Sequence, residues 1–314
     1  MHARSHIQIA AGIFVIAVNM SASNAQADEF AFSSYGLGGA AFGAGATPPP
    51  GTYVSFVTGY YQGEIKGPVT IGKALLDVGL KIEFFQAAVN GLYVAERKVL
   101  DGHFGLSATV PVGHIDLEAG VTGPLNNTIT QETSGWGLGD ITVKAQLGWQ
   151  QGTFAHTAYV QGVAPSGRYS PTFAPNIGLN RPGIDTGWAF TWLEEKSQLQ
   201  FNGALGVTFN FENDETDYDS GTDFHFEWAI GREICKGLTV GVVGYDYRQL
   251  TGDSGDGAIL GPFEGSVDAI GGALSYTTVV GKTPLILSAR HYQEYNADRR
   301  MDGSMTIMSG TVRY

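Results

Sequence analysis

From Gly51 to the end of the chain, apolar and polar side chains alternate with a period of two in one segment after another. In LQFNGALGVTFN, Phe201, Leu205 and Phe209 share one set of alternate positions, and Asn202 and Asn210 share the other. Successive side chains of a β-strand point to opposite faces, so this pattern predicts strands with one apolar and one polar face.

The segments DITVKAQLGWQ and DFHFEWAI repeat the pattern, with charged side chains between large apolar ones. Tilted strands of about ten residues cross an outer membrane, whereas the strands of soluble sandwiches are usually shorter. Twelve segments of this kind are predicted, at 52–61, 77–95, 103–113, 138–149, 153–165, 184–193, 197–211, 222–232, 238–248, 264–277, 284–293 and 304–314.

The connections between these segments alternate in length. Those at 62–76, 114–137, 166–183, 212–221 and 249–263 are long, and those at 96–102, 150–152, 194–196, 233–237 and 278–283 are short. An even number of strands with long extracellular loops and tight periplasmic turns is typical of bacterial outer-membrane proteins. The sequence therefore predicts an all-β fold, a transmembrane antiparallel β-barrel of about 12 strands over residues 51–314.

The first 27 residues have the order of a secretory signal peptide: a basic start, an apolar run from Ile7 to Val18, and the small-residue site Ala25-Gln26-Ala27. Later segments lack the roughly 18 consecutive apolar residues of a membrane helix. The chain ends in MSGTVRY, an alternating strand with a terminal aromatic residue, which resembles the signal read by the barrel assembly machinery. We therefore expect export to the outer membrane of a Gram-negative cell, with its lipid and lipopolysaccharide as partners.

Composition excludes several other classes of protein. Without the signal peptide the chain has 17 basic and 30 acidic side chains, a net charge of −13, which disfavours binding to nucleic acid. Cys235 is the single cysteine, so an internal disulfide is impossible. No phosphate-binding glycine motif occurs, and we expect no cofactor.

No catalytic or metal-binding motif stands out. His103, His156, His225 and His291 fall in predicted strands without a G-x-S-x-G sequence nearby, so no catalytic residues are assigned and we expect no enzyme. The loops NDETDYDSG and GDSGDG are acidic but lack the spacing of a calcium loop, and a solvated acidic loop is the simpler interpretation.

The alternation assigns a set of polar side chains to the inside of the barrel. Charges there must be hydrated or paired, so they line a wet lumen or form a ladder of salt bridges. Tyrosines among them could offer an aromatic ring a path with a cation–π contact to Arg290, although interfacial girdles are an equally good explanation. The candidate lumen-lining residues are Lys81, Glu83, Lys144, His225, Glu227, Arg290, Arg313, Tyr159 and Tyr292.

Residues 28–50, which we call the leader, precede the first strand. They contain too much Gly and too few large apolar residues for a domain, and the three prolines form a stiff spacer that cannot donate to a sheet. The leader is therefore a periplasmic tether or a plug. As a plug, it would fold back into the lumen and place Tyr35, Leu37 and Phe42 there.

The stretches TPPPGTYV, SGWGLGDITVKAQLGW and PNIGLNRPGIDTGWAFTWL resemble the outer-membrane family of the MetA pathway of phenol degradation. The resemblance covers about Thr47 to Tyr314. It implies a transporter-like barrel for the passive uptake of small hydrophobic or aromatic compounds, and it implies no catalytic residues. A structural or adhesive barrel with an occluded lumen remains the alternative.

Overall fold

The computed structural model describes residues 32–71, 74–122, 128–171, 175–258 and 261–314. The predicted signal peptide, residues 1–27, lies outside them. In the described part of the chain, no helix has both the length and the hydropathy needed to cross a membrane.

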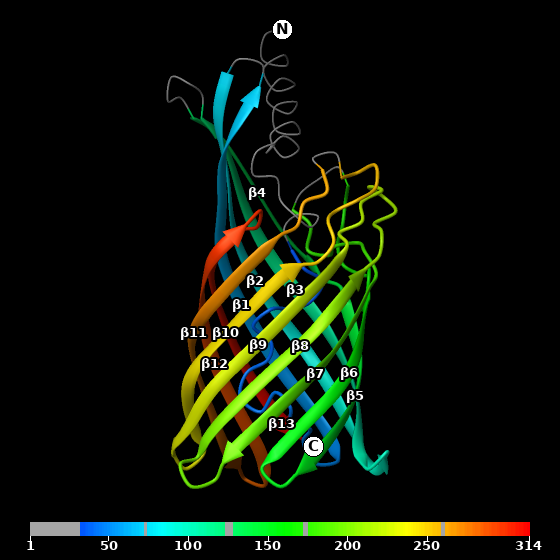
Figure 1. Cartoon of the computed structure of the whole chain (residues 1–314), viewed down its shortest axis with the longest axis vertical. Coiled ribbons are helices and arrows are strands. Elements are labelled where there is room, and N and C mark those ends of the chain that lie inside the picture. The colour runs from blue at the N-terminus through cyan, green and yellow to red at the C-terminus, as the bar shows by residue number, and fades with distance from the viewer. Residues whose placement is uncertain (1–31, 72–73, 123–127, 172–174, 259–260) are drawn as a thin grey trace.

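The described residues form thirteen strands in one antiparallel sheet, which closes because β2 pairs with both β1 and β3. The result is a closed barrel of 12 strands plus one additional strand, β4 (Figure 1). The strands are β1 Gly51–Ile71, β2 Ala74–Val99, β3 Gly102–Thr122, β4 Thr128–Leu138, β5 Ile141–Gln151, β6 Phe154–Ala164, β7 Gly183–Glu194, β8 Leu199–Asn210, β9 Thr222–Cys235, β10 Leu238–Gln249, β11 Ser266–Val280, β12 Thr283–Asp298 and β13 Asp302–Arg313.

The additional strand β4 is an extension of β5. Both strands pair antiparallel with β3, β5 along its first half and β4 along its second. Their common direction is interrupted only at Gly139 and Asp140, and the Gly139 N–H donates to Pro111 O at 3.0 Å. Asp140 fixes the break, because its carboxylate accepts from the backbone N–H groups of Ser166, Gly167 and Leu179.

The prediction of a loop is wrong for two segments. Segments 62–76 and 114–137 are largely strand, in the long β1–β2 hairpin and in β3 and β4, which rise above the rest of the barrel (Figure 1). The short connections are where they were predicted, between β2 and β3, β5 and β6, β7 and β8, β9 and β10, and β11 and β12. We call this end of the barrel the turn end and the opposite end the loop end.

The predicted register of β8 is confirmed. Leu205 and Phe209 are 39% and 46% exposed on the outer face, whereas Asn202 and Asn210 are buried inside. Residues paired across neighbouring strands point to the same face, so this alternation continues around the barrel. The outer face therefore carries most of the exposed large apolar side chains. An outer apolar band of this kind is what a bilayer solvates.

The described part of the leader, residues 32–50, lies inside the barrel (Figure 1). At the loop end, the Phe32 carbonyl accepts from Arg181 Nη2 at 2.6 Å, and the Phe32 ring lies 6.0 Å from that of Phe84. At the turn end, the Pro50 carbonyl accepts from Arg313 Nη2 at 2.6 Å. The leader therefore passes through the lumen from one end to the other before β1 begins.

A matched pair of arginine substitutions on β2 tests the register. Val89 is 51% exposed on the outer face between the rings of Phe85 and Tyr93, while Gln86 faces the lumen. Val89→Arg should lower the free energy of folding into lipid vesicles by about 2–4 kcal/mol, and Gln86→Arg should have a much smaller effect, as measured by urea titration. Equal losses for the two variants would contradict the assigned faces.

Cysteine labelling tests the orientation. After Cys235→Ser removes the native thiol at the end of β9, a cysteine at Ser254 in the β10–β11 loop should react with a membrane-impermeant maleimide on intact cells. A cysteine at Glu195 in the β7–β8 turn should not, because such turns are periplasmic. Both positions are exposed, so access to the thiol depends on the side of the membrane. Labelling of Glu195→Cys alone would invert the topology.

Candidate functional site: the lumen and its leader

Strand β9 is the main support of the leader. The Tyr35 ring stacks on the imidazole of His225, with 3.5 Å between ring centroids and 12° between planes. The Ala40 N–H donates to Glu227 Oε2 at 2.7 Å. Further along, the Phe42 ring lies against Gly231 so closely that a Cβ atom at that position would overlap it.

Neighbouring strands hold the next part of the leader by hydrogen bonds to its backbone. The Gly43 N–H donates to Asn202 Oδ1 at 2.8 Å, and the Gly45 N–H donates to Thr191 Oγ1 at 3.0 Å. The Gly45 carbonyl accepts from Thr157 Oγ1 at 3.0 Å. Side chains of β6, β7 and β8 thus satisfy backbone groups of a segment without regular secondary structure, as buried backbone requires.

Arg181 fastens the leader at the loop end. It is fully buried in the β6–β7 loop and donates through Nε to Ser34 Oγ at 3.2 Å, through Nη2 to the Phe32 carbonyl, and through Nη1 to Ser220 Oγ. Ser34 Oγ in turn donates to Asn210 Oδ1 at 2.7 Å. One guanidinium therefore joins the leader to two loops, which suits its fixed fork of donors.

Apolar contacts complete the support. Leu37, Ala41 and Phe42 pack against a buried cluster of β9 to β13 that includes Val243, Tyr245, Tyr292 and Ile307. Burying such side chains stabilises the lodged leader through the hydrophobic effect.

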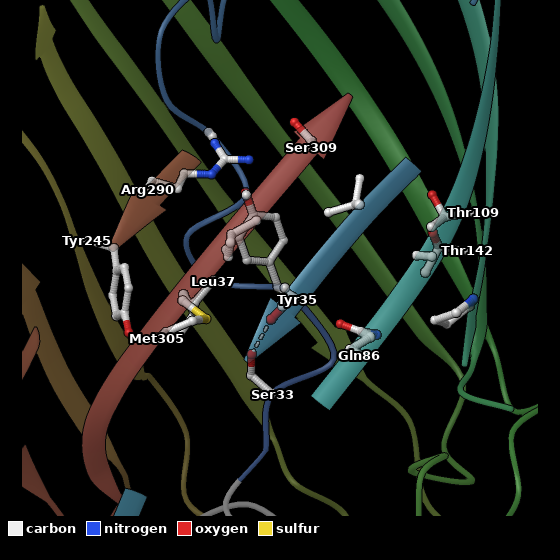
Figure 2. Close-up of a pocket in the computed structure, with 18 of the residues that line it drawn as sticks. Ser33, Tyr35, Leu37, Gln86, Thr109, Thr142, Tyr245, Arg290, Met305 and Ser309 are labelled. Atoms are coloured by element: carbon white, nitrogen blue, oxygen red, sulfur yellow. Dashed lines mark hydrogen bonds between the residues drawn. The ribbon is translucent and has the colours of Figure 1, made fainter. Parts of the chain in front are cut away.

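The leader does not fill the lumen. A cavity of about 790 Å³ runs beside it. Figure 2 shows Tyr35 and Leu37 of the leader with Gln86, Thr109 and Thr142 on one side and Tyr245 and Arg290 on the other. Hydroxyl and amide groups of β2, β3 and β5 form one wall, and the leader with Val57, Met305 and Ile307 forms a more apolar one.

Most of the predicted lumen residues lie inside the barrel. Lys144, Tyr159 and Arg290 border the cavity, and Lys144 Nζ lies 5.5 Å from the Tyr159 ring centroid. No cation–π contact of Arg290 is found among the described residues; Lys144 makes such a contact with Tyr159, and Arg300 makes one with the buried Tyr247 at 4.0 Å. Tyr292 is fully buried, and its hydroxyl donates to the Gly38 carbonyl at 3.4 Å.

Arg313 is exposed at the turn end, where it holds Pro50. Its guanidinium lies 5.9 Å from the Tyr53 ring centroid, and the Tyr53 hydroxyl donates to the Pro49 carbonyl at 2.6 Å. These contacts mark the point at which the leader leaves the lumen and β1 begins.

The assignment of Lys81 and Glu83 to the lumen is wrong. Both lie on the outer face of β2, where Lys81 pairs with Glu118 at 3.5 Å and Glu83 accepts from the Tyr60 hydroxyl at 2.8 Å. The inward side chain between them is Ile82, which is buried. This part of β2 lies toward the loop end, in the segment that rises above the rest of the barrel, where the outer face of a strand can carry charge.

Sequence reasoning missed Asp185, which is fully buried and lies 2.9 Å from His225 Nε2 and 3.0 Å from Thr208 Oγ1. It also missed Arg181. A signal for the leader's seat was present, because the inward positions of β7, β8, β9 and β11 are repeatedly small. These positions are Gly187, Ala189, Ala204, Gly206, Ala229, Gly231, Ala269, Gly271 and Ala273.

The acidic loops pack against each other. Asp219 and Ser254 exchange two backbone hydrogen bonds of 2.9 Å. Among the described residues, no three His, Cys, Asp or Glu side chains come together as a metal site would need.

Known proteins share features of both the sequence and the architecture of this chain. A profile of the family described as "Putative MetA-pathway of phenol degradation" matches residues 41–308. No curated protein sequence is significantly similar. An outer membrane channel from Pseudomonas putida F1 has a similar structure, with a TM-score of 0.65 and 13% sequence identity over 86% of this chain and 98% of that one.

Two further solved structures match less closely. The transport unit of the autotransporter AIDA-I from Escherichia coli has a TM-score of 0.42 and 8% identity, over 95% of this chain and 96% of that one. The CymD monoaromatic hydrocarbon channel has a TM-score of 0.41 and 10% identity, over 94% of this chain and 99% of that one. The first match supports an outer-membrane barrel fold.

Gly45 offers a test of the leader's position. A Cβ atom there would overlap backbone atoms of Phe190, which cannot move without distorting β7. Gly45→Val should therefore displace the leader from the wall and increase its cleavage by chymotrypsin in the folded protein. Ala46→Val is the matched control, because Ala46 is exposed. Equal cleavage of the two variants would show that the wall does not hold Gly45.

Proposed function

We propose that this chain, which belongs to the family of the MetA pathway of phenol degradation, is an outer-membrane channel for small hydrophobic or aromatic solutes such as phenols. The observation that carries the proposal is the cavity of about 790 Å³ inside a closed barrel, bordered by both polar and apolar side chains. Small-molecule sites commonly combine an apolar lining with a few polar groups that fix orientation.

The two walls of the cavity suit an amphipathic ring. A solute passing between them can keep its ring against Leu37, Met305 and Ile307 of the apolar wall. Its hydroxyl can exchange hydrogen bonds with Gln86 and Thr109 of the opposite wall. No single contact is strong, so a solute can enter and leave, as conduction requires.

The leader is the constriction of the proposed channel. It takes up the part of the lumen that lies against β6 to β9, and its backbone is tied to side chains rather than to a strand edge. Withdrawal of the leader therefore breaks no strand pairing. We assign it the role of a plug that limits flux, and not that of a periplasmic tether.

The proposed setting follows from the fold. We expect a processed chain in the outer membrane, inserted by the barrel assembly machinery and surrounded by lipid and lipopolysaccharide. An occluded structural or adhesive barrel is the competing function, and flux measurements separate the two.

Deletion of residues 33–46 is the direct test. In the described part of the chain the first strand begins at Gly51, so the variant should fold, as checked by circular dichroism in liposomes. Its conductance in planar bilayers and its uptake of phenol should both rise above those of the full chain. Ala46→Val serves as the control that retains the leader. A folded deletion variant that conducts no more than the full chain would contradict the plug, and absence of phenol uptake in both would favour the occluded barrel.

A further inference from the structure

Among the described residues of the leader, Tyr35 is the one whose ring rests on polar side chains, which we call the seat. Beneath its ring lies His225, whose Nε2 is 2.9 Å from Asp185 Oδ1. His225, Asp185 and Glu227 are all at most 1% exposed. The tyrosine side chain thus covers a group of buried polar side chains.

The chemistry of this seat matches a neutral phenol. The Tyr35 phenol interacts electrostatically with Glu227, Asp185 and Tyr159. A carboxyl oxygen accepts a hydrogen bond from a hydroxyl group, so the seat favours a ring that carries one, and burial there disfavours a ligand that carries a charge. The flat imidazole provides a stacking surface for a single aromatic ring.

The other leader rings and apolar side chains lie elsewhere. Phe42 rests on Gly231, and Leu37 packs on the apolar cluster. The position of Tyr35 is therefore specific for a ring that carries a hydroxyl, and a phenylalanine would leave the buried carboxylates without that group.

We propose that this seat is a binding site for monocyclic phenols, and that Tyr35 occupies it as a built-in ligand until a phenolic solute replaces it. The inference rests on the proposed channel function and assigns it a residue-level site on His225, Glu227 and Asp185. Tyr35 and Tyr159 both border the cavity, so a solute already in the cavity is adjacent to the site.

Three atoms of the site have no partner. His225 Nδ1, Asp185 Oδ2 and Glu227 Oε1 are buried and make no hydrogen bond to any described residue. Buried polar atoms are nearly always satisfied in folded proteins, so unsatisfied ones beneath a ring that borders the cavity point to a ligand or a water molecule. This observation is independent of the stacking geometry.

Tyr35→Ala tests the proposal in the full chain. The variant removes the competing ring and leaves the seat intact, so equilibrium dialysis with labelled phenol should show binding about tenfold tighter than in the unmodified protein. Binding should decrease in the order phenol, toluene, benzoate, because toluene lacks the hydroxyl donor and benzoate adds a negative charge.

Phe42→Ala is the matched control, because it opens a ring-sized space on the apolar seat of the same leader. It should give no preference for phenol over toluene. Adding Glu227→Gln to Tyr35→Ala keeps the side-chain shape and an acceptor for Ala40 N–H, yet should reduce the ratio of phenol to toluene affinity severalfold. A Tyr35→Ala variant that is folded by circular dichroism but binds phenol no better than the Phe42→Ala variant would overturn the proposal.

Separate experiments test the binding site and the channel function. The difference in dialysis binding between the detergent-solubilised Tyr35→Ala and Phe42→Ala variants reports the seat, and liposome flux reports the channel. Phenol flux that rises on leader deletion, together with no phenol preference in Tyr35→Ala, would overturn the site and leave the channel. Phenol preference without flux in any variant would overturn the channel and leave a phenol site in an occluded barrel.

Discussion

The inability of lipid to form hydrogen bonds with backbone groups is the constraint on which this structure depends. It requires every strand edge in the membrane to be paired, and the β2–β3 pairing meets that requirement by closing the sheet. The interruption at Gly139 and Asp140 is satisfied from the β6–β7 loop, where Arg168 N–H donates to Leu138 O at 2.7 Å. Closure also creates a lumen, and its contents determine what the barrel can do.

A chain segment without strand pairing, and not a ladder of salt bridges, occupies much of that lumen. Small inward residues such as Ala204 and Ala229 make room for the leader, and polar side chains such as Asn202 and Glu227 bind its backbone. The barrel strands hold one another by main-chain hydrogen bonds that do not involve the leader. The interior can therefore rearrange while the wall stays closed, which a lumen filled by wall side chains could not do.

The alternation of side chains was sufficient to predict the barrel, the turns and the face of Leu205, because lipid outside and polar groups inside impose opposite demands on neighbouring residues. The same signal fails where the outer face is solvated and not covered by lipid. Most of β4 is exposed, so TITQETSGWGL resembles a loop. At Lys81 the outer face carries the charge and the inward Ile82 is buried, so the polarity of the two faces is reversed. The approach of Tyr35 to His225 links residues 190 positions apart, and local pattern contains no information on such a contact.

A tethered phenol ring also explains how a specific site can belong to a channel. A side chain on a short segment competes with a free solute at an effective concentration of the order of millimolar or more. The apparent affinity of the solute falls by the ratio of that effective concentration to the dissociation constant of the tethered side chain. The solute is recognised by the imidazole and carboxylates but is not retained, because Tyr35 returns to the seat. Selectivity then comes from the chemistry of His225 and Glu227, while rapid release comes from the leader, and the two properties can be altered by separate mutations.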